Sequence, residues 1–207
     1  MSTKKPIRRI APYYEVGSFG VPKEYASAVC RSAVGVVSRY VGPIALVSIK
    51  GMRIRSDGSE LPLSRLHIMN EESHTVLFTK RTVTDAAGGL EGHRLGGLTR
   101  VERILVTSLT PTEIKFGIEE KTAIAVAVNN GTGLMNQPAA MMATIHEIGH
   151  SFSLGHCEVT ETCVMSPTDE GWRGSHAVPK KPFCDDHGSE LRNFAAKAAA
   201  DVLLNFQ

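Results

Sequence analysis

The segment that decides how the chain is interpreted is His146-Glu147-Ile148-Gly149-His150-Ser151-Phe152-Ser153-Leu154-Gly155-His156-Cys157. Two histidines four residues apart lie on one face of a helix, where both imidazoles can bind one metal ion. The opposite side of the helix predicted over about residues 139–152 is apolar and suited to burial against a sheet. Glu147 is displaced by about 100° from His146. It can therefore flank the metal without binding it, where a general base belongs.

His156 can reach the same metal only if the helix ends after His150. In a continuous helix it would lie ~15 Å further along the axis than His146. Gly155 is able to adopt the backbone conformation that such a reversal often uses. Three neutral imidazoles leave a fourth position for water, as in catalytic zinc sites, whereas structural sites are closed by four protein ligands. The spacing therefore predicts that His146, His150 and His156 bind a catalytic zinc ion.

The cysteines indicate metal binding by their placement. Cys157, Cys163 and Cys184 lie close together in the sequence and share their region with most of the histidines, while Cys30 stands alone. A disulfide framework is not expected in a chain of 207 residues without a signal peptide. We therefore expect a second metal site in this region and a buried, free Cys30.

Composition excludes several classes of protein. With 42% hydrophobic residues and a net charge of +2, the chain is neither disordered nor basic enough to indicate a nucleic-acid partner. No apolar run is long enough to span a bilayer. The basic N-terminal residues are followed by no apolar stretch. We therefore expect a cytoplasmic monomer that binds neither nucleic acid nor membranes.

Alternating strand and helix patterns predict one α/β domain. Helices are predicted over residues 22–40, 139–152 and 189–206, with Ser189 as the N-cap of the last. Strands are predicted over residues 7–10, 44–54, 75–84, 101–109 and 123–128. Residues 157–188 have few periodic apolar positions. We therefore expect an upper α/β subdomain over residues 1–156 and a small, irregular C-terminal subdomain over residues 157–207.

The histidine segment resembles the long zinc signature of metzincin metallopeptidases, H-E-x-x-H-x-x-G-x-x-H followed by a Met-turn. Cys157 directly after the third histidine, the run Cys163-Val164-Met165 and the later pair of Cys184 and His187 resemble the archaemetzincin family in particular. The resemblance covers residues 144–187. It implies a metzincin-like zincin fold with a twisted mixed sheet, an active-site helix, a cleft below it and a C-terminal helix. It also implies a second, structural zinc ion held by cysteines, with Met165 beneath the catalytic metal.

The sequence departs from the family pattern at four points. Ser153 replaces the motif glycine, so either Ser153 adopts a positive φ or Gly155 makes the turn. Two spacings, from Cys157 to Cys163 and from Met165 to Cys184, are each longer by about one residue. His187 stands where the family has a cysteine, and three cysteines with one histidine still form a closed zinc site. Rival fourth ligands are Asp185, Asp186, His176 and Cys30.

The resulting hypothesis is a zinc metallopeptidase of peptide or protein substrates that binds two zinc ions. Water activated by the catalytic zinc would attack the scissile carbonyl, with Glu147 as general base. An extended peptide would pair with an edge strand, for which residues 101–109 are the candidate. One alternative is a non-catalytic zinc-binding protein that uses the same fold to bind a peptide or partner. Another is a zincin whose third ligand is Glu170 or Glu190. The remaining histidines, His67, His74 and His93, have no ligand spacing.

Overall fold

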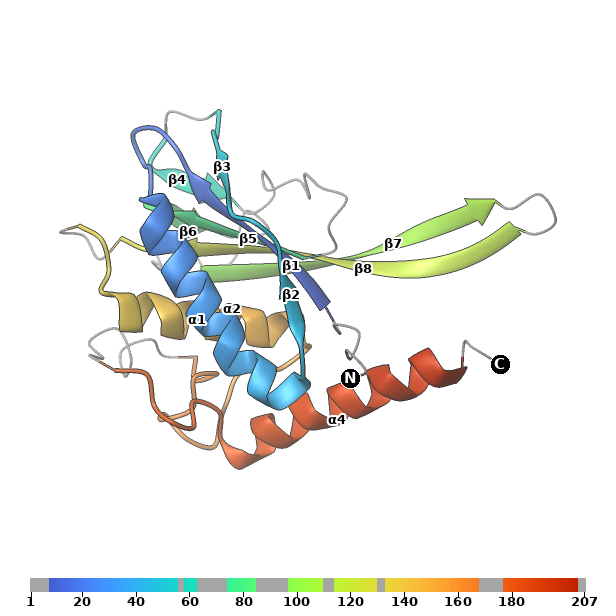
Figure 1. Cartoon of the computed structure of the whole chain (residues 1–207). Helices are drawn as coiled ribbons and strands as arrows, with labels where there is room; N and C mark the ends of the chain where they lie inside the picture. The colour runs from blue at the N-terminus through green and yellow to red at the C-terminus, as the bar shows by residue number, and fades with distance from the viewer. Residues whose placement is uncertain are drawn as a thin grey trace.

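The computed structural model describes residues 8–55, 58–62, 74–84, 97–109, 114–129, 133–167 and 177–204. A six-stranded sheet in the order β2-β1-β5-β8-β7, with β3 also paired to β1, has two helices on one face (Figure 1). Its strands are β1 (Arg8–Glu15), β2 (Ile44–Leu46), β3 (Lys50–Met52), β5 (His74–Thr79), β7 (Gly97–Leu109) and β8 (Ile114–Ala127). A small second sheet pairs β4 (Glu60–Pro62) with β6 (Thr82–Thr84). The helices are α1 (Lys23–Val41), α2 (Gln137–Ser151) and α4 (Asp185–Leu204).

The sheet is mixed, which confirms the predicted fold class. The pairs among β1, β2, β3, β5 and β8 are parallel, and among the described strands of this sheet only β7 and β8 pair in antiparallel fashion. β7 is the last strand of the sheet, and Thr99 in β7 is opposite Ile124 in β8. β5 pairs with β8 only over residues 122–127, and β7 and β8 continue beyond it as a two-stranded ribbon (Figure 1).

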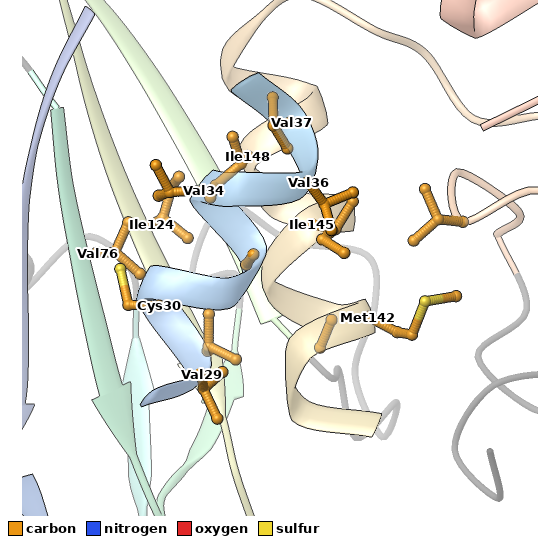
Figure 2. Close-up of a cluster of buried hydrophobic side chains, with 14 of the residues drawn as sticks. Val29, Cys30, Val34, Val36, Val37, Val76, Ile124, Met142, Ile145 and Ile148 are labelled. Atoms are coloured by element: carbon orange, nitrogen blue, oxygen red, sulfur yellow. The ribbon is translucent and has the colours of Figure 1, made fainter. Parts of the chain in front are cut away.

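The main core lies between the sheet and helices α1 and α2. α1 packs Val29, Cys30, Val34 and Val37 into it, and Figure 2 shows these side chains between the sheet and α2. α2 contributes Met142, Ile145 and Ile148, and the sheet contributes Val76 and Ile124. Complete burial of such an aliphatic side chain stabilises a fold by roughly 1.5–3 kcal/mol. This packing fixes the back of α2 and leaves its other side for polar residues.

Cys30 is a free, fully buried thiol at the centre of this core, as expected from the apolar stripe around it. Burial raises the pKa of the Cys30 thiol to about 12, so the group stays protonated at neutral pH.

Helix α2, which carries His146, Glu147 and His150, begins two residues earlier than predicted. The side chain of its N-cap Asn136 accepts a 2.8 Å hydrogen bond from the backbone N–H of Ala139. Pro138 occupies the first turn, where a missing N–H costs nothing.

Several predicted boundaries were wrong. The strand predicted over residues 75–84 is two strands, β5 and β6, which belong to different sheets. Helix α4 begins at Asp185, so Ser189 lies inside it and is not the N-cap. The strand predicted over residues 44–54 is two short strands separated by residues 47–49, which have no strand conformation. The strand predicted over residues 123–128 is the end of the much longer β8. Within the part of the chain that the structure describes, no helix combines the length and apolarity needed to cross a bilayer.

Candidate active site and second metal centre

The three motif histidines converge at the end of α2. The imidazoles of His146, His150 and His156 each offer a nitrogen, and these nitrogens lie within 4.8 Å of one another. The Nε2 atoms of His146 and His150 are 3.0 Å apart. The ring of His156 lies 4.9 Å from that of His150 and 5.3 Å from that of His146, measured between centroids. One ion can therefore contact all three rings.

Backbone carbonyls orient two of these imidazoles. Nδ1 of His146 lies 2.7 Å from the carbonyl oxygen of Val164, and Nδ1 of His150 lies 2.8 Å from that of Leu154. Because a carbonyl oxygen only accepts, both Nδ1 atoms must carry the proton, and both Nε2 atoms are left with a lone pair for a metal. Burial lowers the pKa of His146 to about 4 and also lowers that of His150, so both rings are neutral at pH 7.

The chain reverses after α2 through Ser153. Ser153 has φ 65°, while Gly155 does not adopt a positive φ, so the first of the two alternatives for this turn is correct. The N–H of Leu154 donates to the carbonyl of Gly149, and that of Ser153 donates to the carbonyl of His150. These two bonds form a Schellman motif, in which the left-handed residue is usually glycine. The reversal brings His156 back to the other two histidines.

Met165 packs against α2 between the two histidine ligands. It is completely buried, and a Cβ added to Gly149 would lie 2.5 Å from its Sδ atom. Only a residue without a side chain at position 149 allows this approach. Met165 therefore lies against the helix segment that carries His146 and His150, as the resemblance implied for a Met-turn.

Glu147 is buried beside the histidines, with only 5% of its surface exposed. Thr99 of β7 lies within hydrogen-bonding distance of it twice: Oγ1 is 2.6 Å from Oε2 of Glu147 and 2.9 Å from its backbone oxygen. Burial raises the pKa of the Glu147 carboxyl to about 8, and the hydrogen bond from Thr99 acts in the opposite direction. A pKa near neutrality suits a group that accepts and returns a proton.

Cys157, Cys163, Cys184 and His187 form a second cluster, whose ligand atoms also lie within 4.8 Å of one another. Nδ1 of His187 is 3.1 Å from the Sγ atom of Cys184 and 3.6 Å from that of Cys163. All three thiols are free of disulfide bonds. The early start of α4 explains the position of His187, because this residue lies in its first turn, three residues after Cys184.

The rival ligands lie elsewhere or outside the described residues. Asp185 and Asp186 are exposed, Cys30 is a residue of α1 that points into the core, and His176 is not among the described residues. Of the two glutamates considered as third ligands of the first site, Glu190 is exposed on α4 and Glu170 lies outside the described residues. His67 and His93 also lie outside them, whereas His74 is buried and hydrogen-bonded by Arg8.

Comparison with solved structures agrees with this geometry. The chain has an archaemetzincin-like fold. The crystal structure of the archaemetzincin from Methanopyrus kandleri matches it with a TM-score of 0.59 and 18% sequence identity, over 91% of this chain and 96% of the other. No family model and no curated protein matches the sequence. The similarity therefore lies in the three-dimensional fold. In the sequence it is visible only in the short histidine and cysteine motifs.

In this archaemetzincin-like fold, the two clusters share one segment of backbone. His156 of the first cluster and Cys157 of the second are consecutive, and the N–H of Cys157 donates to the carbonyl of Met165 over 2.7 Å. Val164, between Cys163 and Met165, supplies the carbonyl that orients His146. A displacement of the backbone at either cluster is therefore transmitted to the other cluster through two or three residues.

Both donor sets fit zinc. Three neutral imidazoles are the ligands of an open, catalytic site, and three thiolates with one imidazole are those of a closed, structural site. The structure thus contains two candidate metal sites that are consistent with two zinc ions.

Thr99 is the residue of this site that the sequence did not reveal. It precedes the strand that the sequence predicted over residues 101–109, and a lone threonine in a strand has no distinguishing pattern. Only the pairing of β7 with β8 brings it beside α2.

Proposed function

We propose that this protein is a zinc-dependent metallopeptidase in which Glu147 is the general base. One observation carries the proposal. His146, His150 and His156 converge next to Glu147, a buried glutamate on the helix that also carries His146 and His150. The archaemetzincin-like fold supports it, because the family that the histidine segment resembles and the family of the solved structure that this chain matches are the same.

Zinc is the metal proposed for the three histidines, since neutral imidazoles are preferred zinc ligands and the tautomers of His146 and His150 leave Nε2 available. When bound there, zinc supplies Lewis acidity next to the carboxyl of Glu147. The chain's own contribution is to hold the rings neutral and oriented through Val164 and Leu154.

Glu147 moves the proton of the reaction. Its Oε2 atom is held by Thr99, so we assign the proton transfer to Oε1. Oε1 takes a proton from the attacking water as the new C–O bond forms on the scissile carbonyl carbon. It gives this proton to the amide nitrogen as the C–N bond breaks, so that the products are a carboxylic acid and an amine, and the acid proton then passes to the amine to give a carboxylate and an ammonium group.

The substrate class proposed is a peptide or an extended segment of a protein. β7 is the terminal strand of the main sheet, and α2, with Glu147, packs against it. A peptide that adds to the side of β7 that pairs with no other described strand gains main-chain hydrogen bonds and passes close to Glu147. The predicted strand 101–109 lies within β7, and the strand extends to Gly97.

For the second cluster we propose a structural zinc ion that holds residues 157–207 as a small subdomain against residues 1–156. Cys157, Cys163 and His187 are buried, and they bring together the chain after α2 and the first turn of α4. A metal ion here adds to the apolar contacts that Val164, Met165 and Phe183 of this segment make with the main core.

The test of the proposed function is the variant Glu147→Gln. We expect kcat for cleavage of a peptide library to fall by about 100- to 10,000-fold, while metal analysis finds the same zinc content as in the wild type. Glu190→Gln is the matched control, because Glu190 is exposed on α4, and it should leave both readings unchanged. Full turnover by Glu147→Gln contradicts the role of Glu147. A wild-type protein that is loaded with zinc but cleaves no peptide supports the non-catalytic alternative.

A further inference from the structure

Thr99 is the contact through which the edge strand reaches the general base. We propose that Thr99 is a positioning residue that holds the Glu147 carboxylate in its reactive orientation. This inference rests on the proposed function of the site. It is carried by two distances, 2.6 Å from Oγ1 to Oε2 and 2.9 Å from Oγ1 to the backbone oxygen of Glu147.

The two contacts together fix one side-chain conformation. The Thr99 hydroxyl has one proton, which it donates to Oε2 or shares between the two oxygens of Glu147; in either case Oγ1 lies close to the α2 backbone, and its position defines where Oε2 must lie. Glutamate has three rotatable side-chain bonds, and each unrestrained rotation spreads the position of Oε1 over distances greater than a hydrogen bond tolerates. Misplacement of a reacting group by about 1 Å can cost about 100-fold in rate.

Burial makes this single polar contact important. With 5% of Glu147 exposed, water contributes little to satisfying its oxygens. A buried carboxyl oxygen without a hydrogen bond is costly, and the Thr99 hydroxyl, 2.6 Å from Oε2, provides one. Serine retains the hydroxyl and can replace Thr99, whereas valine retains the shape and loses the donor.

The location of Thr99 also couples the base to the strand expected to receive the substrate. Thr99 belongs to β7, and its partner in the register is Ile124 of β8, which is completely buried in the core. β7 therefore has a fixed position at this point. A peptide aligned along β7 and the carboxyl of Glu147 are positioned by the same strand, so their relative placement does not depend on a mobile loop.

The experiment compares Thr99→Val and Thr99→Ser with the wild type. Thr75→Val is the matched control, because Thr75 is on β5 of the same sheet and its hydroxyl contacts the backbone oxygen of Thr122, at 3.4 Å. We expect Thr99→Val to lower kcat by about 10- to 100-fold with KM within about twofold and zinc content unchanged. Thr99→Ser should recover most of kcat, and Thr75→Val should match the wild type.

A second measurement does not depend on turnover. In the metal-free protein with ¹³C-labelled glutamate, the carboxyl resonance of Glu147, assigned by its loss in Glu147→Gln, should move in Thr99→Val and stay in place in Thr99→Ser. Wild-type kcat in Thr99→Val, or a Glu147 resonance that does not move in this variant, overturns the inference. A wild-type protein that cleaves nothing contradicts the proposed function instead, and the carboxyl resonance then decides alone whether Thr99 holds Glu147.

Discussion

At the scale of single residues, Ser153 occupies a conformation that costs free energy. Its φ of 65° places Cβ close to the following carbonyl, at about 1–2 kcal/mol for a residue other than glycine. Glycine removes this strain but makes the unfolded chain more flexible, which offsets part of the gain. The Schellman motif that closes α2 and brings His156 to the site therefore carries strain that one substitution can remove.

We expect Ser153→Gly to raise the free energy of unfolding by about 0.5–1 kcal/mol, and Tm by about 1–3 °C, in the zinc-loaded protein. Scanning calorimetry of both proteins at the same zinc concentration measures the change. Ser153→Ala keeps Cβ and should show no increase. A Tm of Ser153→Gly at or below that of the wild type would contradict the assignment of strain to this residue.

The residues of the candidate site were predictable to the extent that they follow a local repeat. His146, Glu147 and His150 are set by the period of one helix, and His156 by the need for a turn after it. The sequence left two alternatives for that turn, because Ser153 and Gly155 can each make it. Thr99 could not be found, since its contact with Glu147 spans 48 positions and depends on how a strand pairs.

At the scale of elements, α2 was predicted closely and β8 was not. α2 has a strong apolar period, a cap at Asn136 and a proline in its first turn. The first half of β8 contains glycine and several charged residues, and it is a strand because β7 pairs with it along its whole length. Helix α4 starts at Asp185 because the acidic residues of its first turn favour a helix N-terminus.

His74 at the start of β5 makes the stability of the fold depend on pH. Burial and the nearby Arg8 guanidinium lower the pKa of His74 to about 3, and Nη1 of Arg8 lies 3.1 Å from its Nε2. Between pH 6.5 and 3 the unfolded chain therefore binds a proton at His74 and the folded chain does not. The contribution of His74 to the free energy of unfolding is therefore fully present above pH 6.5 and decreases as the pH falls below this value.

We expect the free energy of unfolding of the wild type, relative to His74→Gln, to decrease by about 1–2 kcal/mol between about pH 6.5 and pH 5. The glutamine side chain of this variant has no proton to bind and can still accept a hydrogen bond from Arg8. Urea unfolding of both proteins at several pH values gives the difference, in which effects of acid on the metal sites cancel. A difference that is constant with pH would show that His74 titrates equally in both states.

At the scale of the whole molecule, the alternation of strand and helix patterns predicted the α/β class and the order of the main elements. The mixed character of the sheet followed from the family resemblance, since pairing direction has no local signal. The structure confirms both. The paths of residues 157–167 and 177–187 were not predictable from hydrophobic periodicity, because the three cysteines and His187 that converge there follow no apolar pattern.

Removing metal should therefore affect the stability of the whole chain. We expect about two zinc ions per chain in the wild type, one for each cluster, and about one in His187→Ala. Chelation should lower Tm by roughly 10 °C, since a ligand at about 1,000 times its Kd stabilises a fold by about 4 kcal/mol. Metal analysis of the wild type and His187→Ala measures the zinc content. Calorimetry of the wild type before and after chelation measures the change in Tm. Two zinc ions retained by His187→Ala would exclude His187 as a ligand.

The backbone shared by the two clusters also constrains how the protein can be made. When residue 157 leaves the ribosome, all three histidines have been synthesised, but the carbonyl of Val164 and the side chain of Met165 have not. The segment that contains them is in turn held by the Pro182 carbonyl, which accepts a 2.7 Å hydrogen bond from the N–H of Val164. A growing chain therefore cannot complete the contacts that orient His146 until Pro182 has been translated.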